Sequence, residues 1–188
     1  MMFRGLHLWR VVAAAAVTLA LLAGFGAWSG SRSNDASLAT ALAAHPQVAD
    51  VTVESAGGEL QAVVNLGPVP NLREAYLEIS RRAEAAAQGR PVALRVTDRR
   101  SPQLLADYYA LHYYVAEAMA RGTFPETAQS LLDAGGERGL DHVGFYVDPD
   151  RIYLQLHRGD DYLYEIIPRN GSQPGATGGG SAETQMVD

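Results

Sequence analysis

The longest uninterrupted apolar stretch lies near the beginning of the chain. Leu8 to Ser29 is apolar or small throughout, apart from Arg10. Roughly 20 such residues are enough to cross a hydrocarbon core of about 30 Å as a helix. Ala, Leu and Val occupy every side of this helix and leave no polar face, which argues against a buried helix of a soluble core. The pattern therefore predicts a membrane segment over residues 8–29.

The residues that flank this segment predict its orientation. Arg4 and Arg10 precede the apolar run, and basic residues favour the cytoplasmic side. Trp9 and Trp28 fall at its two ends, where indole rings favour the headgroup level. We expect a single-pass protein of the cell membrane, with a cytoplasmic N-terminus and an extracytoplasmic body.

A cleaved signal peptide is the alternative for the same segment. Met1–Arg10 would be its basic part, Val11–Phe25 its apolar part, and Ala27–Ser29 would supply the small residues at the cleavage site. The body would then be secreted. Both interpretations export the body, and the length of the run favours the uncleaved anchor.

Residues 1–30 form the predicted anchor or signal segment, and residues 31–37 form a polar linker. In residues 38–98, segments with one hydrophobic period alternate with segments that have another. A period near 3.6 predicts helices, and a period of two predicts strands. Asn71 is a suitable N-cap, and the glycines and prolines mark the turns. The expected elements are a helix over Leu38–Ala44, strands over Val51–Glu54 and Leu60–Leu66 around a Gly57-Gly58 turn, a helix over Leu72–Gln88, and a strand over Val92–Thr97.

This first unit resembles known modules. HPQVADVTVES, GELQAVVNL, NLREAYLEI and PVALRVTD are similar in order and spacing to the small αββαβ modules of ring-forming secretion and sporulation proteins. They also resemble the cytoplasmic dimerisation domain of cation-diffusion transporters. Both resemblances imply self-association rather than catalysis. In the transporter family the module binds metal through His and carboxylates, but only His45 offers an equivalent here, so no metal site is carried over.

Residues 99–168 predict a second unit that begins with two helices. Ser101-Pro102 is a helix start, and Gly122 lies just past the expected end. The apolar face of this long helix is wider than a surface helix needs, so we expect it to lie between the two units or against a partner. Thr123 and Glu126 match a capping box for a shorter helix that glycines end near residue 135.

Three short strands follow the helices. They are expected at His142–Val147, Ile152–His157 and Tyr162–Ile167, with Asp- and Gly-rich turns between them. Alternation along these strands predicts an antiparallel meander with one solvent-exposed face. Residues 169–188 have no apolar period, so we expect a disordered tail. The predicted fold class is α+β: an N-terminal transmembrane helix, an αββαβ unit, a helix pair and a three-stranded meander.

Composition excludes several kinds of chemistry. The chain contains neither Cys nor Lys, so disulfides, thiol catalysis, Schiff bases and the lysine of a phosphate-binding loop are ruled out. A net charge of −6 argues against nucleic acid as a partner, since binding phosphates needs a basic face. No cofactor is expected.

Tyrosines are the most suggestive candidates for a binding surface. They concentrate on the long helix and on the meander, and tyrosine offers contact area together with a hydrogen bond. The alternative is that about half of them pack the helix on the sheet. The candidate contact residues are Tyr109, Tyr113 and Tyr114 on the helix and Tyr153, Gln155 and His157 on the exposed sheet face.

Metal binding and catalysis receive little support. His112 and Glu117 are five residues apart, which aligns poorly on a helix. His142 and His157 lie on neighbouring predicted strands, but no third ligand is visible. We therefore expect neither a metal site nor an enzyme.

The favoured function is a membrane-anchored extracytoplasmic accessory or assembly module that acts by protein–protein contact. Its partner would be itself or another membrane protein. One alternative is a small-ligand-binding domain with its site in a groove between the two units, which would need a closed apolar pocket. A second alternative is a small hydrolase that uses carboxylates from the turns.

Overall fold

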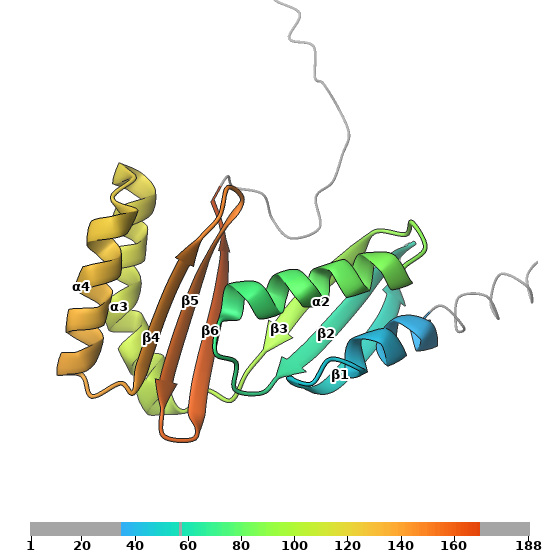
Figure 1. Ribbon diagram of the computed structural model, residues 1–188, viewed down its shortest axis with the longest axis horizontal. Coiled ribbons are helices and arrows are strands. Elements are labelled where there is room, and N and C mark those ends of the chain that lie inside the picture. The colour runs from blue at the N-terminus through green and yellow to red at the C-terminus, as the bar shows by residue number, and fades with distance from the viewer. Residues whose placement is uncertain (1–34, 57, 170–188) are drawn as a thin grey trace, which may run out of the picture.

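A computed structural model describes residues 35–56 and 58–169, and these form an α+β fold with two three-stranded sheets (Figure 1). Residues 35–43 are helical. The elements that follow are β1 (Val48–Ala56), β2 (Glu59–Leu66), α2 (Leu72–Ala86), β3 (Val92–Thr97), α3 (Pro102–Arg121), α4 (Phe124–Glu137), β4 (His142–Val147), β5 (Arg151–Arg158) and β6 (Asp161–Pro168).

The first unit is a sheet with helices on one face. β1 pairs antiparallel with β2, and β2 pairs parallel with β3 because α2 carries the chain back across the sheet between them. Residues 35–43 and α2 bury Leu38, Leu42 and Ile79 against Leu60 and Val64 of β2. The order helix, strand, strand, helix, strand predicted from the hydrophobic pattern is confirmed.

Local capping chemistry fixes the start of α2 and both ends of α3. The Asn71 side-chain oxygen accepts a hydrogen bond from the Glu74 N–H at 3.2 Å, and Ser101 Oγ accepts one from the Leu104 N–H at 3.3 Å. Gly122 ends α3 in the left-handed conformation, with φ of 74°. These predicted boundaries are confirmed.

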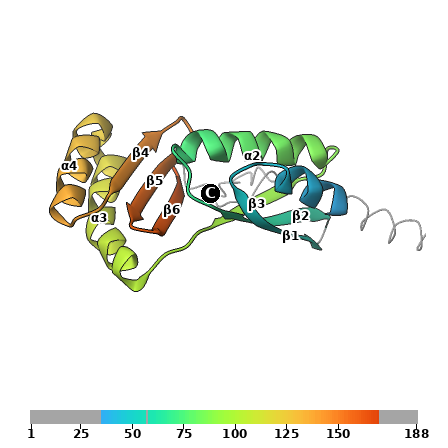
Figure 2. The same ribbon diagram turned by 60° about the horizontal axis from the view of Figure 1, so that its bottom comes forward.

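The second unit places α3 and α4 on one face of the sheet β4-β5-β6. The predicted antiparallel meander is confirmed. Leu104 and Leu111 of α3 and Leu131 of α4 are fully buried against Ile152 and Leu154 of β5. The other face of this sheet is turned toward α2 and the first sheet, as Figure 2 shows.

One prediction about this unit is wrong, and one of the two positions expected for the long helix is excluded. The meander has no exposed face at its centre, because Tyr153 and Gln155 are 0% exposed and pack against the first unit. The long helix α3 does not lie between the two units. It contacts α4, β5 and β6 on the side of the sheet that is remote from the first unit.

The beginning and end of α4 also differ from the prediction. The Thr123 side chain makes no capping hydrogen bond, so the expected capping box is wrong. The helix continues through Gly135 and Gly136 to Glu137. Gly135 is retained inside the helix because its backbone lies against Val143, where any Cβ would overlap the Val143 Cγ2 methyl.

Alanine substitutions at these adjacent glycines should have opposite effects. Gly135→Ala is expected to destabilise the protein by about 1–3 kcal/mol through overpacking against Val143. Gly136→Ala is the matched control, because a Cβ there meets nothing within 4 Å. It should stabilise the helix by about 0.5–1 kcal/mol. Chemical denaturation measures both, and equal midpoints for the two variants would contradict the close approach of α4 to β4.

The predicted membrane segment at residues 8–29 and the predicted tail beyond Arg169 lie outside the described residues. Within residues 35–56 and 58–169, no helix has the length and apolar character needed to span a membrane.

Candidate functional site

The two units meet at a loop formed by residues 67–71, between β2 and α2, which we call the junction loop. Gln155 of β5 bonds this loop with one amide atom and the first residue of α2 with the other. Its Oε1 accepts a hydrogen bond from the Leu72 N–H at 3.0 Å, and its Nε2 donates to the Val69 carbonyl at 2.6 Å. The Tyr164 hydroxyl accepts from the Val69 N–H and donates to the Gly67 carbonyl, both at 3.0 Å. Side chains of the second unit thus satisfy four backbone groups of the first.

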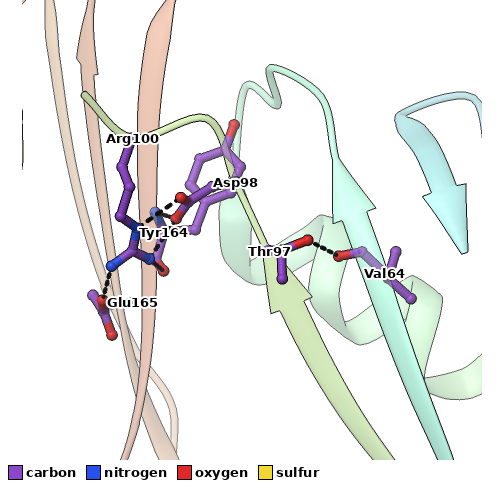
Figure 3. Close-up of polar contacts among 6 residues, drawn as sticks. All are labelled: Val64, Thr97, Asp98, Arg100, Tyr164 and Glu165. Carbon is purple, nitrogen blue, oxygen red and sulfur yellow. Dashed lines mark hydrogen bonds and ion pairs between the residues drawn. The ribbon is translucent and has the colours of Figure 1, made fainter. Parts of the chain in front are cut away.

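A charged cluster holds the chain where it passes from the first unit to the second (Figure 3). The Asp98 carboxylate is 2% exposed and accepts a hydrogen bond from the Tyr164 N–H at 2.8 Å. Arg100 donates to both Asp98 oxygens, at 2.8 and 2.7 Å, and to Glu165 at 2.9 Å. These hydrogen bonds raise the pKa of Arg100, chiefly through Asp98, so the guanidinium stays charged.

Tyr153 also lies in the contact between the units. Its ring centroid is 5.8 Å from that of Tyr76 on α2. Its hydroxyl donates to Asp148 Oδ2 at 2.7 Å. Burial and the Asp148 carboxylate raise the pKa of Tyr153, and burial raises the pKa of Tyr164 to about 12. Both phenols therefore remain neutral hydrogen-bonding groups.

His157 completes the junction and is half-buried. Its Nε2 lies 3.0 Å from Gln155 Nε2. Its ring centroid is 5.4 Å from that of His142, its register partner on β4, and 6.2 and 6.0 Å from the rings of Tyr162 and Tyr164. Burial lowers the pKa of His157, and the neighbouring His142 lowers it further, against the opposing effect of Asp141.

The other candidate surface is the outward face of α3. Tyr109, Tyr113 and Tyr114 are 58%, 69% and 37% exposed. Two of these tyrosines lie in a stripe of exposed, uncharged residues with alternating spacings of three and four, which we call the α3 seam. The seam consists of Ala106, Tyr109, Tyr113, Ala116 and Ala120.

The predicted contact residues therefore divide into two separate groups. Tyr109, Tyr113 and Tyr114 lie on an accessible helix face. Tyr153 and Gln155 are fully buried and contact the first unit of the same chain, so they do not form a surface for a partner. The structure does not bring the helix tyrosines and the strand residues together, because they face opposite sides of the sheet.

Several polar residues were missed by sequence reasoning. Asp98 and Arg100 were not singled out, although together they hold the segment between β3 and α3 to β6. Asp107 on α3 was not singled out, yet it is 3% exposed and pairs with Arg158 at 2.6 Å. Its position between Leu104 and Leu111 on the apolar stripe is the signal that could have revealed it.

No metal site was expected, and in the part of the chain that the structure describes no group of three or more His, Asp or Glu side chains is arranged to hold an ion. His142 and His157 are neighbours, but they have no third ligand among these residues. The turn role predicted for Asp148 is confirmed, since its carboxylate accepts hydrogen bonds from the N–H groups of Asp150 and Arg151. These bonds and the one from Tyr153 lower the pKa of Asp148, although burial opposes them.

The surface formed by the described residues has shallow hollows, of which two are relevant here. One, of about 390 Å³, is lined by residues of α2 that include Arg81 and Glu84, together with Arg151. The other, of about 200 Å³, lies between α4 and β4 beside Leu132 and Phe145. Neither is a closed pocket at the junction, where Tyr76, Tyr153, Gln155 and Tyr164 are packed together.

The fold and the site define an α+β protein of two units joined by a buried polar contact. No protein-family model, curated protein or solved structure matches this chain.

Proposed function

We propose that this protein is an extracytoplasmic accessory or assembly module, anchored in the membrane by residues 8–29, that acts by protein–protein contact. The observation that carries the proposal is the α3 seam. Its residues are exposed and uncharged, on a helix of 20 residues whose opposite side is fully packed. Packing among residues 35–56 and 58–169 does not cover this face.

The chemistry of the seam suits another helix as its partner. Alternating spacings of three and four keep apolar residues on one line along a helix, as in helices that pack side by side. Alanines let a neighbouring backbone approach, and the two tyrosines supply large amphipathic side chains of the kind enriched at interfaces. The Glu117–Arg121 ion pair, at 2.6 Å, flanks the seam as a polar rim.

A second copy of the chain is the partner to test first. Tethering to a membrane confines copies to one plane and raises their effective concentration, so a modest contact area suffices. The resemblance of residues 38–98 to ring-forming modules also favours self-association. Another membrane protein is the alternative partner, and the experiment below separates the two by mass.

Replacing Tyr109, Tyr113 and Tyr114 by Ser should reduce association at least about tenfold, because loss of a single hot spot of about 2 kcal/mol exceeds the roughly 1.4 kcal/mol that corresponds to tenfold in affinity. The measurement is photo-crosslinking from an unnatural amino acid at Ala116, in the full chain in membranes. A product of twice the chain mass identifies self-association.

The matched control carries three Ser substitutions at exposed positions on the outer face of the first sheet, Glu54, Gln61 and Asn65. It should crosslink like the wild type. If the tyrosine variant keeps its unfolding midpoint and also crosslinks like the wild type, the α3 seam is not the interface.

The other functions considered from the sequence receive less support. A ligand groove between the units would need open space, and that contact is occupied by Tyr76, Tyr153 and Gln155. A carboxylate-dependent hydrolase would need two acidic side chains converging in a cleft, and the Asp148 carboxylate is engaged by its own turn and by Tyr153.

A further inference from the structure

We propose that the contact between the two units is a pH-sensitive clasp, in which protonation of His157 releases the Gln155 amide from the junction loop. The clasp is independent of the α3 seam, which lies on the opposite side of the sheet. It is built from three groups that meet in the interior: an amide, an imidazole and the backbone of the junction loop.

The orientation of the Gln155 amide is fixed by its backbone partners. Oε1 lies 3.0 Å from the Leu72 nitrogen, a donor, and Nε2 lies 2.6 Å from the Val69 oxygen, an acceptor. Exchanging the two amide atoms would set donor against donor and acceptor against acceptor. The group near His157 is therefore the amide NH₂, which can only donate.

This orientation determines the protonation state of His157. Its Nε2 lies 3.0 Å from Gln155 Nε2, so it must accept the second N–H of the amide. An imidazole nitrogen accepts only when it carries no proton. In the clasped form, His157 is consequently neutral, with its ring proton on Nδ1. If Nε2 carried a proton, two N–H donors, one from His157 and one from Gln155, would face each other at hydrogen-bond distance.

The groups that face His157 favour the neutral ring on balance. From the β4 side, His142 disfavours a positive charge on His157, whereas Asp141 favours one. From β6, the rings of Tyr162 and Tyr164 cover it without charge. From the first unit, Leu72 opens α2, and the positive end of a helix disfavours a nearby cation. Burial is the largest influence, and it lowers the pKa of His157.

The sign of the pH dependence follows. A histidine in water has a pKa of about 6.5. In the clasped form, the pKa of His157 is lower than that. The unclasped form therefore binds the proton more tightly. The clasp is complete above about pH 6.5 and weakens as the pH falls, and between the two pKa values the ratio of unclasped to clasped protein rises by up to about tenfold per pH unit.

Release is expected to affect the backbone groups of Leu72 and Val69 differently. The Leu72 N–H loses its acceptor when Gln155 turns away, whereas the Val69 N–H keeps the Tyr164 hydroxyl at 3.0 Å. Asp98 and Arg100 also continue to hold the segment between β3 and α3 to β6. The Val69 amide thus serves as an internal reference for the Leu72 amide.

Amide hydrogen exchange of the full chain in detergent micelles tests the clasp, followed by NMR between pH 7.5 and 5 and corrected for intrinsic exchange. The protection of Leu72 should fall up to about tenfold per pH unit over the transition, while that of Val69 changes little. His157→Gln should abolish the dependence, because its side-chain oxygen accepts from Gln155 without titrating. His142→Gln is the control and should retain the transition at a higher pH, since a competing positive charge is removed.

Two results would overturn the clasp. One is equal loss of Leu72 protection in the wild type and in His157→Gln. The other is an unchanged Leu72 amide in the wild type after His157 has titrated. The imidazole nitrogen shifts of the wild type give a test that needs no variant: Nε2 must be unprotonated at pH 7.5, and a proton found there rejects the proposal.

Discussion

Replacing Gln155 by Leu is expected to lower the free energy of unfolding by about 2–6 kcal/mol, because each buried backbone group left without a partner costs about 1–3 kcal/mol. Leucine is close to glutamine in volume, so the main loss is of the hydrogen bonds to Val69 and Leu72. Both lie in the buried contact between the units, where water cannot replace the amide without opening it. Denaturation of the full chain in detergent measures the effect.

Gln61→Leu is the matched control for this variant. Gln61 also lies in a strand, but its side chain is exposed on the outer face of the first sheet. Its replacement should change the free energy of unfolding by no more than about 0.5 kcal/mol. Similar losses in both variants would mean that the Gln155 amide does not fasten the two units.

The junction also explains which parts of the fold could be predicted from the sequence. The start of α2 and both ends of α3 follow from Asn71, Ser101 and Gly122, because capping depends on residues within one turn of the helix. The same holds for the Asp148 turn. Such predictions require no knowledge of what lies across the molecule, and the structure confirms them.

The buried side of the meander could not be assigned in this way. Alternation of period two shows that a strand has two faces, but it does not say whether the more polar face meets water or another part of the protein. Tyr153 and Gln155 are polar at their tips and large in volume, and their polar atoms are satisfied by Asp148 and by the junction loop. The informative signal is the absence of charge at the centre of that face.

The role of α3 illustrates the same limit. Its apolar face is wider than a surface helix needs, which indicates a contact beyond the one with the sheet. The pattern alone does not determine whether that contact is with the first unit or with a partner. In the structure the side with Leu104, Leu111 and Val115 is buried, and the side with Tyr109 and Tyr113 remains exposed.

Asp107 is an acidic residue on the otherwise apolar buried side of α3. A carboxylate at such a position needs a hydrogen-bonding or ion-pair partner. Its carboxylate is bonded to Arg158 of β5 at 2.6 Å and lies 3.6 Å from Arg138 at the end of α4. The acid thus links three elements of the second unit. An ionised group 3% exposed is retained at this depth only when it is paired.

Asp107→Ala is accordingly expected to destabilise the protein by about 3 kcal/mol, the lower end of the range of about 3–5 kcal/mol for breaking a buried ion pair. The lower end applies because the Arg158 side chain is 27% exposed and keeps its hydrogen bond to the Arg138 carbonyl.

Glu117→Ala on the same helix is the matched control. Its pair with Arg121 is equally short, but both side chains are more than half exposed, and exposed pairs contribute at most about 1 kcal/mol. Denaturation midpoints compare the two variants, and a loss for Asp107→Ala no larger than that for Glu117→Ala would show that the buried pair does not hold α3 and α4 to the sheet.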